Sequence, residues 1–256
     1  MPKLVLSFFL LVAAQPVVFS KQPTRVAKRD VMSTQVEEKF STSAKSKRKI
    51  SQPRSVVTFP SGASLPIAPS EIRSRRADYD PNHSGNPLLI TSGKYRNIKL
   101  STNFTVGEYA RSGGVQFDVS RIDPEHVRCL QQIRNAVGRP VWIDSGYRSF
   151  VYNNELYKRR GEKPTRSQHI SGRGTDIRIG NMTGLEIAEA AIDACGPDIG
   201  IGIGPRYAHI DGRGHFAIWK YKGSNASQVA AVKQYRQSSH LAQNRSSRVS
   251  AKRVRA

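Results

Sequence analysis

Apolar residues recur at helical spacing after Asp123-Pro124-Glu125, which provides an N-cap residue, a proline at the first helical position and an acid in the first turn. The apolar positions are Val127, Leu130, Ile133 and Val137. Gly138 follows them and is typical of a helix C-terminus. A second helix is predicted from Thr183 to Cys195, because Thr183-Gly-Leu-Glu186 has the pattern of a capping box.

Between and after these helices the pattern changes to that of short strands. The apolar run Val141-Trp142-Ile143 predicts a buried strand within residues 140–144. Residues 175–179 alternate, which places Asp176 and Arg178 on one face and the isoleucines between them on the other.

Three more strands are predicted near the end of this region, at residues 199–204, 207–210 and 216–221. In the first of them, isoleucines alternate with glycines, so one face is bare and lets a ligand or another backbone come close. Helices and short strands in mixed order favour an α+β domain, with a small, largely antiparallel sheet and flanking helices.

The folded domain is predicted to span residues 87–222, because the sequence on either side is polar, basic and without apolar period. Residues 21–86 are interpreted as a basic disordered spacer and residues 223–256 as a basic tail. Residues 1–20 have the pattern of a signal peptide: a short positive start, an apolar run and a cleavage site after Ser20. The alternative for residues 1–20 is an uncleaved membrane anchor, and no later stretch is apolar enough to cross a bilayer.

The chain carries 41 Lys and Arg against 19 Asp and Glu, a net charge of +22. Such a charge favours polyanions as partners. Export to the periplasm, the cell envelope or the medium makes anionic envelope polymers or lipid headgroups the expected partners of the basic flanks, and nucleic acid is not expected. Nucleic-acid binding would require that the chain is not cleaved after Ser20. We expect a monomer.

The two cysteines, Cys129 and Cys195, both fall in predicted helices. They would pair in an oxidising compartment or remain as two buried thiols, and the sequence alone leaves both possibilities open.

The residues that carry chemistry follow residue 166, in the stretch Ser167-Gln-His169-Ile-Ser-Gly172-Arg-Gly174-Thr-Asp176 and in the later His209-Ile-Asp211. Imidazole nitrogens and a carboxylate oxygen are the ligands of a catalytic zinc ion that keeps one position open for water. The two glycines let the chain turn after His169, so that Asp176 points back to the same metal. We therefore predict one zinc ion per domain, held by His169, Asp176 and His209. We assign no role to His126 or His215.

These residues resemble the motifs of peptidase family M15, the zinc D-Ala-D-Ala carboxypeptidases and murein endopeptidases, within the group that includes the hedgehog signalling domain. The resemblance rests on Ser-x-His-x-x-Gly-x-x-x-Asp, on His-x-Asp at residues 209–211 and on Ser145-Gly-Tyr-Arg148-Ser upstream, followed by Asn153 or Asn154. It covers about residues 94–221.

The resemblance implies roles for the individual residues. His169, Asp176 and His209 would hold zinc, and Asp211 would be the general base and acid of peptide hydrolysis. An alternative makes Asp211 the third ligand and His209 the base. Arg148 would bind a substrate carboxylate or the oxyanion, or else only bridge loops through carboxylates. Ser167 is expected to cap or support the His169 loop.

The implied function is zinc-dependent hydrolysis of peptidoglycan stem peptides or of their cross-links, by a D-Ala-D-Ala carboxypeptidase or a murein endopeptidase. The sequence does not choose between these bonds. The alternative from another class is a catalytically inactive zinc-containing domain of the same fold that binds the wall or takes part in signalling.

Overall fold

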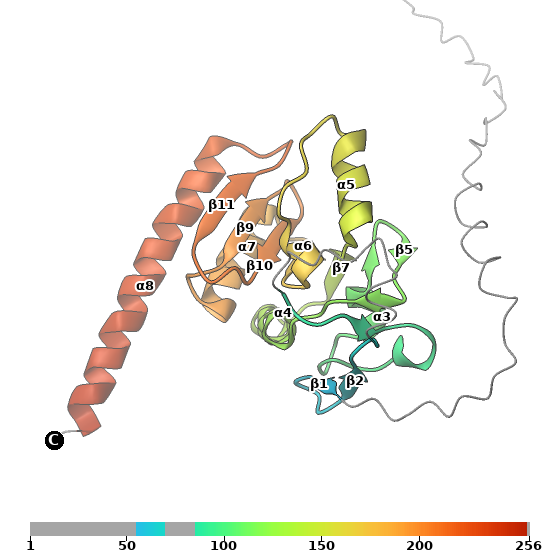
Figure 1. Ribbon diagram of the computed structural model, residues 1–256. Helices are drawn as coiled ribbons and strands as arrows, with labels where there is room; N and C mark the ends of the chain where they lie inside the picture. Colours follow the sequence, from blue (N-terminus) through green and yellow to red (C-terminus); the bar gives the residue numbers. More distant parts are fainter. Residues whose placement is uncertain (1–54, 70–84, 255–256) are drawn as a thin grey trace, which may run out of the picture. The chain divides into compact units, whose positions relative to one another are not determined.

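The computed structural model describes residues 55–69 and 85–254, with the side chains of residues 240 and 242–254 excepted (Figure 1). The predicted signal peptide and the predicted spacer, apart from residues 55–69 and 85–86, lie outside the described residues.

One sheet organises the described part of the chain. Its strands are β4 (Arg111–Ser112), β5 (Val115–Gln116), β7 (Val141–Ser145), β8 (Gly174–Ile179), β9 (Gly200–Ile203), β10 (Ala208–Asp211) and β11 (Ala217–Lys220). Their order across the sheet is β11-β9-β10-β8-β7-β4-β5. Neighbouring strands are antiparallel, except that β11 runs parallel to β9. The predicted α+β class with a largely antiparallel sheet is confirmed.

The helices connect and flank these strands. They are α3 (Val106–Tyr109), α4 (Pro124–Val137), α5 (Phe150–Arg159), α6 (Gln168–Ser171), α7 (Gly184–Cys195) and α8 (Ala226–Val254), with the 3₁₀ turn η2 (Gly93–Tyr95). Helices α4 and α7 have the predicted capping residues. Asp123 caps the first turn of α4, and Gly138 ends this helix with φ 62°. Thr183 and Glu186 form a capping box at the start of α7. The sequence pattern did not predict α3, α5 or α6, and it predicted α8 only over residues 226–235.

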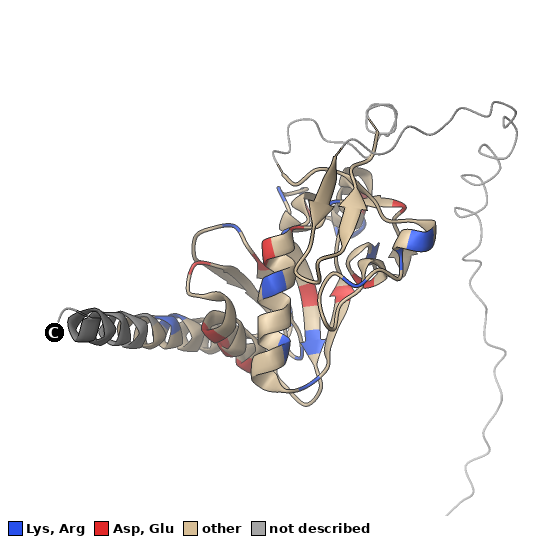
Figure 2. Ribbon diagram, turned by 90° about the horizontal axis from the view of Figure 1, so that it is seen from below, with Lys and Arg blue, Asp and Glu red and all other residues tan. Residues whose placement is uncertain are grey.

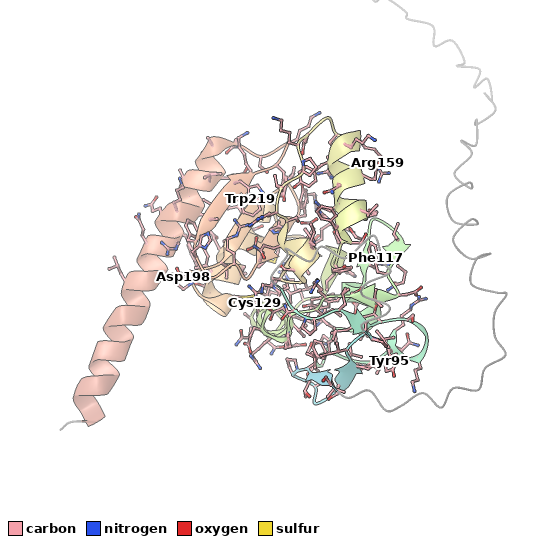
Figure 3. The ribbon with its side chains drawn as sticks, viewed as in Figure 1. Tyr95, Phe117, Cys129, Arg159, Asp198 and Trp219 are labelled. Atoms are coloured by element: carbon pink, nitrogen blue, oxygen red, sulfur yellow. A yellow bond between two sulfur atoms is a disulfide. The ribbon has the colours of Figure 1, made fainter. Side chains whose placement is uncertain are left out.

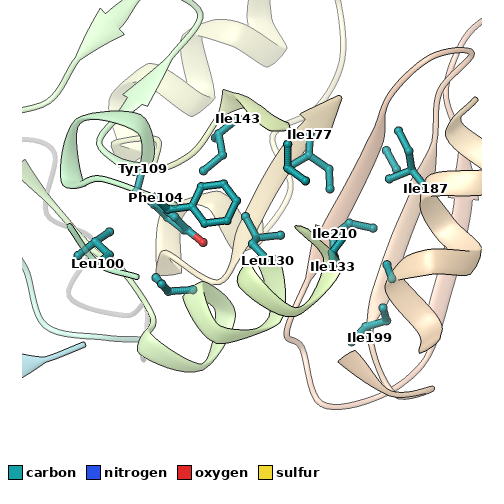
Figure 4. Close-up of a cluster of buried hydrophobic side chains, with 14 of the residues drawn as sticks. Leu100, Phe104, Tyr109, Leu130, Ile133, Ile143, Ile177, Ile187, Ile199 and Ile210 are labelled. Atoms are coloured by element: carbon teal, nitrogen blue, oxygen red, sulfur yellow. The ribbon is translucent and has the colours of Figure 1, made fainter. Parts of the chain in front are cut away.

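The sheet has two chemically different faces because side chains alternate along each strand. Ile177 and Ile210 point from β8 and β10 into the apolar core, which Leu130 of α4 and Ile187 of α7 complete (Figure 4). Ile201 of β9 belongs to the same core. A fully buried isoleucine contributes roughly 1.5–3 kcal/mol through burial alone. The opposite face of the same strands carries two of the predicted metal ligands, Asp176 and His209, so the core fixes the strands that hold them.

Packing extends beyond the predicted domain limits of residues 87 and 222. The hairpin β1 (Val56–Thr58) and β2 (Ser64–Pro66) brings the fully buried Leu65 into the core, and a second pair joins β3 (Leu89–Ile90) to β6 (Val119–Ser120). At the other end, Val232 of α8 is fully buried, and the Tyr235 hydroxyl donates to Asp193 at 2.5 Å. Among the described helices, none is both long and apolar enough to cross a membrane.

Cys129 and Cys195 form a disulfide that links α4 to α7, with 5.1 Å between their Cα atoms. Of the two possibilities that the sequence left open, the structure therefore has the disulfide.

Candidate metal centre

Strand pairing brings two of the three predicted ligands together. His209 of β10 lies directly opposite Asp176 of β8, and Gly202 of β9 lies on the other side of His209. Directly opposite residues of an antiparallel pair point to the same face of the sheet. Asp176 and His209 therefore meet on the face turned away from the isoleucine core.

The third ligand comes from the short helix α6, which precedes β8. Ser167 caps this helix, its hydroxyl accepting a hydrogen bond from the backbone N–H of His169 at 3.4 Å, as expected. Gly172 ends the helix with φ 73°, and a Cβ at this position would collide with the backbone of Arg121. Only glycine fits both conditions, which is the physical reason for the glycine after His169.

The three predicted ligands converge on one point. His169 Nε2 lies 3.1 Å from His209 Nδ1 and 3.3 Å from Asp176 Oδ1, and His209 Nδ1 lies 2.9 Å from Asp176 Oδ1. Both imidazoles are almost fully buried, at 2% and 4% exposed. The only cluster of potential metal ligands found within the described part of the chain consists of these three residues.

Hydrogen bonds on the far sides of the rings determine what the converging atoms can do. His169 Nδ1 donates to the carbonyl oxygen of Gly146 at 2.7 Å, and His209 Nε2 donates to Asp211 Oδ2 at 3.0 Å. A neutral imidazole has one N–H, so His169 Nε2 and His209 Nδ1 then carry lone pairs. Together with the carboxylate oxygen of Asp176 they form a triangle of three acceptors, and such a triangle favours a positive charge at its centre.

The pKa values in this triangle agree with a site built for a positive charge. Burial, together with the nearby Arg148 guanidinium, lowers the pKa of His169 to about 4, so this ring is neutral at pH 7. Burial would raise the pKa of Asp176, but the two histidines more than offset it and hold that pKa well below its usual range. Burial would lower the pKa of His209, but its hydrogen bonds to Asp176 and Asp211 raise it overall. In the absence of a metal, a proton on His209 would thus balance the two carboxylates.

The donor set fits zinc. Zinc takes imidazole nitrogen and carboxylate oxygen at about 2.0–2.1 Å, and tetrahedral ligands at that distance stand about 3.3 Å apart. The separations of 2.9–3.3 Å observed here match that spacing. His169, Asp176 and His209 would hold the ion.

Asp211 lies behind His209 rather than among the converging atoms. Its side chain is fully buried and accepts from His209 Nε2 and from Arg213, whose Nε and Nη2 lie 2.8 and 2.6 Å from its two oxygens. Burial alone would raise the pKa of Asp211, but these bonds lower it below its usual range. A carboxylate that orients a ligating histidine fixes its tautomer and increases its basicity. This geometry favours His209, and not Asp211, as the third ligand.

Arg148 lies in a comparable position behind Asp176. Its Nη2 donates to Asp176 Oδ2 at 2.6 Å, while its Nε donates to the hydroxyls of Ser145 and Ser112 at 3.0 and 3.3 Å. Arg148 thus links β8 to β7 and β4 through one carboxylate and two hydroxyls, whereas the alternative from the sequence was a bridge through carboxylates. Arg148 also lines the cleft above the triad, so the bridge does not remove it from the site.

The triad opens into a cleft of about 550 Å³. His169 and His209 line the cleft together with residues that the sequence did not single out for the site, and these include Tyr157, Glu162, Arg166, Arg213, Tyr221 and Lys222. Trp219 of β11, labelled in Figure 3, also lines the cleft. Trp142, which belongs to the run predicted as a buried strand, is instead 49% exposed.

The glycine face of β9 explains how the cleft wall is built. A Cβ on Gly202 would lie 2.6 Å from the indole nitrogen of Trp219, and a Cβ on Gly200 would collide with Arg213 and Asp211. The bare face of β9 therefore accommodates side chains from β10, from β11 and from the connection between them. The sequence had indicated instead that a ligand or another backbone would approach this face. Alternation with glycine was the only sequence signal for this wall.

A cluster of two histidines and an aspartate, with both histidines lining a cleft, is an arrangement that can hold a metal with an open coordination position. Residues 100–211 match the model of the family described as peptidase M15, which confirms the predicted family resemblance over that segment. The chain is also 30% identical over 95 residues to the peptidoglycan L,D-endopeptidases MepK of Escherichia coli (strain K12) and Shigella flexneri. The alignments cover 36% of this chain and 52% of each relative, so the chain spans about half the length of these curated relatives.

Proposed function

We propose that this protein is a zinc-dependent peptidase that hydrolyses peptidoglycan stem peptides or their cross-links. The observation that carries the proposal is the triangle of three acceptor atoms, from His169, Asp176 and His209, at the base of an open cleft. When bound, zinc supplies Lewis acidity, which activates water and polarises a peptide carbonyl. The match to the peptidase M15 family supports the reaction class.

The remaining residues hold and complement the ligands. Arg148 keeps Asp176 in place through one guanidinium nitrogen, and its remaining N–H groups would stabilise the oxyanion or bind a substrate carboxylate. Asp211 keeps His209 in one tautomer.

The proton route has two candidate carriers. Asp211 is the expected general base and acid, but its buried carboxylate is already bonded to His209 and Arg213 and would have to move or act through the ring of His209. Glu162 is the carboxylate among the cleft-lining residues of the described chain and is exposed. A general base must come within hydrogen-bond reach of the water, and such contacts often tighten only when substrate binds. Comparing Asp211→Asn with Glu162→Gln by the pH profile of kcat identifies the carrier.

The relatives favour cross-link cleavage over trimming of a terminal residue, because both are named L,D-endopeptidases. Export follows from this substrate, and the disulfide is typical of an oxidising compartment. We also propose that the basic flanks bind anionic envelope polymers or lipid headgroups.

The test is to incubate the purified, zinc-loaded protein with muropeptide monomers and dimers and to identify the products by mass spectrometry. Conversion of dimers to monomers indicates an endopeptidase, and loss of one terminal residue indicates a carboxypeptidase. Addition of a chelator and the variant His169→Ala are both expected to abolish either product.

A zinc-binding domain without turnover is the second candidate. It is favoured by the hydrogen bonds that the carboxylate of Asp211 already accepts from His209 and Arg213. Stoichiometric zinc with no product from any muropeptide across a range of pH would support this alternative and contradict the peptidase.

A further inference from the structure

Arg213 lies between the buried Asp211 and the wall of the cleft. Its Nε and Nη2 donate to the two oxygens of Asp211 at 2.8 and 2.6 Å, and its backbone N–H donates to the same carboxylate at 3.2 Å. Its guanidinium stacks on the ring of Trp219, with its central carbon 4.9 Å from the ring centroid. This residue lies just beyond the segment that matches the peptidase family, which ends at residue 211.

Asp211 occupies only one edge of this guanidinium. The group is planar and carries five N–H donors in a fixed fork. The N–H of Nε and one N–H of Nη2 point to Asp211, and Nη1 has no hydrogen bond to any other residue that the structure describes. The edge formed by Nη1 and Nη2 thus keeps two parallel N–H groups, the geometry that binds a carboxylate through both oxygens.

The side chain that carries this second edge is partly exposed and lines the cleft. The side chain of Arg213 is 24% exposed, whereas the Asp211 side chain is fully buried. Arg213 is among the residues that line the cleft, and its Nη1–Nη2 edge is the one that Asp211 leaves unused. Stacking on Trp219 fixes the plane of the guanidinium, which reduces the conformational entropy lost when a ligand binds.

The surroundings favour a negative ligand. Arg166 and Lys222 line the same cleft, where Glu162 is the acidic residue among the lining side chains. The charge of Asp211 is shared between Arg213 and His209. A carboxylate entering here meets a positive potential next to the aromatic surface of Trp219, where water screens the charges less than in bulk solvent.

We propose that Arg213 binds a carboxylate of the substrate through its free edge, so that the cleft selects peptides with a free carboxylate near the scissile bond over the same peptides with a carboxamide. This inference rests on the proposed peptidase function and names the substrate class of that site. The carboxylate would be a side-chain, backbone-terminal or branch carboxylate of the peptide. Amidating each carboxylate of a test peptide in turn identifies which one is bound.

The experiment compares the wild-type protein with Arg213→Gln and Arg213→Lys on peptides that differ only in one amidated carboxylate. Arg206→Gln is the matched control, because Arg206 is exposed and does not line the cleft. For the wild type we expect kcat/KM to fall roughly 10- to 100-fold when the bound carboxylate is amidated, because one hydrogen bond to a charged group is lost. The decrease should come mainly from a higher KM. Arg213→Gln should lose a similar factor on the carboxylate peptide and little on the carboxamide peptide. Arg213→Lys should keep part of the preference.

Comparing the carboxylate and carboxamide peptides distinguishes two roles of Arg213: binding the substrate and holding Asp211 in place. An equal loss on both peptides in Arg213→Gln would show that Arg213 acts only through Asp211, and a wild type without any preference would also overturn the inference. Binding of the same peptides to the zinc-loaded protein, followed by tryptophan fluorescence, provides a readout that needs no turnover. Should no peptide be hydrolysed, the proposed function fails, while a carboxylate preference in binding that Arg213→Gln removes would still support the role of Arg213. Equal zinc content and unfolding midpoint in all variants control for misfolding.

Discussion

The two ring nitrogens of His209 face different carboxylates, and this separates the roles of Asp176 and Asp211. Nδ1 lies 2.9 Å from Asp176 in the ligand triangle, and Nε2 lies 3.0 Å from Asp211 on the far side of the ring. The sequence predicted all three residues from their chemistry and motif. It left the roles of His209 and Asp211 open, because the direction in which an imidazole points depends on the strands beside it.

Removing Asp211 should weaken zinc binding without abolishing it. Loss of a carboxylate that orients a ligating histidine typically costs 10- to 100-fold in metal affinity, so we expect a decrease of roughly this size in Asp211→Ala. His169→Ala removes a ligand and should lose stoichiometric zinc. Both are measured by competition with a chromogenic chelator. Unchanged zinc affinity in Asp211→Ala together with lost activity would instead support Asp211 as the general base.

Gly200→Ala tests the support of His209 without removing any functional group. A Cβ at Gly200 would collide with Arg213 and Asp211, whereas a Cβ at Gly212 would meet nothing within 4 Å. Neither glycine has a positive φ, so alanine causes no backbone strain at either position. We expect zinc affinity to fall by roughly tenfold or more in Gly200→Ala, the size of effect known for outer ligand partners, and to stay unchanged in Gly212→Ala. Equal affinities in the two variants would mean that Asp211 adjusts without moving His209.

Several residues of the cleft wall could not be predicted from the sequence. Arg213, Trp219 and Tyr221 belong to the site because β11 pairs with β9 in parallel, a contact that no local pattern encodes. Glu162 lies in a polar stretch that resembles any exposed loop. His169 and Asp176, in contrast, were predictable because a glycine-rich turn and an alternating strand follow each other directly.

At the level of elements, the prediction succeeded where one face of a strand or helix is buried. Ile177 and Ile179 alternate with Asp176 and Arg178 because β8 separates the core from the site. The long helix α8 has no comparable apolar stripe, and its first part is held by Val232, Tyr235 and a few polar bonds to α7 and the residues after it. The hairpin β1–β2 was missed because its short apolar stretches, which include Phe59 and Leu65, lie within a long polar and basic region.

The disulfide between α4 and α7 should stabilise the fold more than the site. It joins residues 66 apart, and closing a loop of that length in the unfolded chain corresponds to about 4 kcal/mol in the chain-entropy model. For the double variant with Cys129→Ala and Cys195→Ala, we expect the free energy of unfolding to fall by roughly 2–4 kcal/mol. The measurement is urea unfolding in the presence of a chelator, so that zinc binding does not contribute. Zinc stoichiometry should persist, since the proposed ligands lie on α6, β8 and β10. An unchanged unfolding midpoint would contradict the prediction.

For the whole molecule, charge is distributed differently in the folded part and in the flanks. Basic and acidic residues are interspersed along the coloured part of the ribbon in Figure 2. The sequence after Asp211 has no acidic residue at all, and it includes Arg245, Arg248, Lys252 and Arg253. The net charge of +22 therefore arises largely outside the region that forms the cleft, which supports a role for the flanks in binding a large polyanion.

Because most of the positive charge lies in the flanks, we expect salt to lower the rate of hydrolysis of whole cell wall more than that of a small peptide. Raising the ionic strength from about 0.1 M to about 1 M shortens the Debye length from about 10 Å to about 3 Å, which screens exposed charges far more than contacts within the cleft. We expect the rate on intact anionic peptidoglycan to fall by about tenfold or more, the lower end of what electrostatic steering contributes. The rate on a soluble muropeptide of low charge should change much less, because it depends on the buried triad. Both rates are measured on the same zinc-loaded preparation, with zinc content checked at each salt concentration. If both substrates lose the same factor, the flanks do not direct the protein to the wall, and its positive charge needs another explanation.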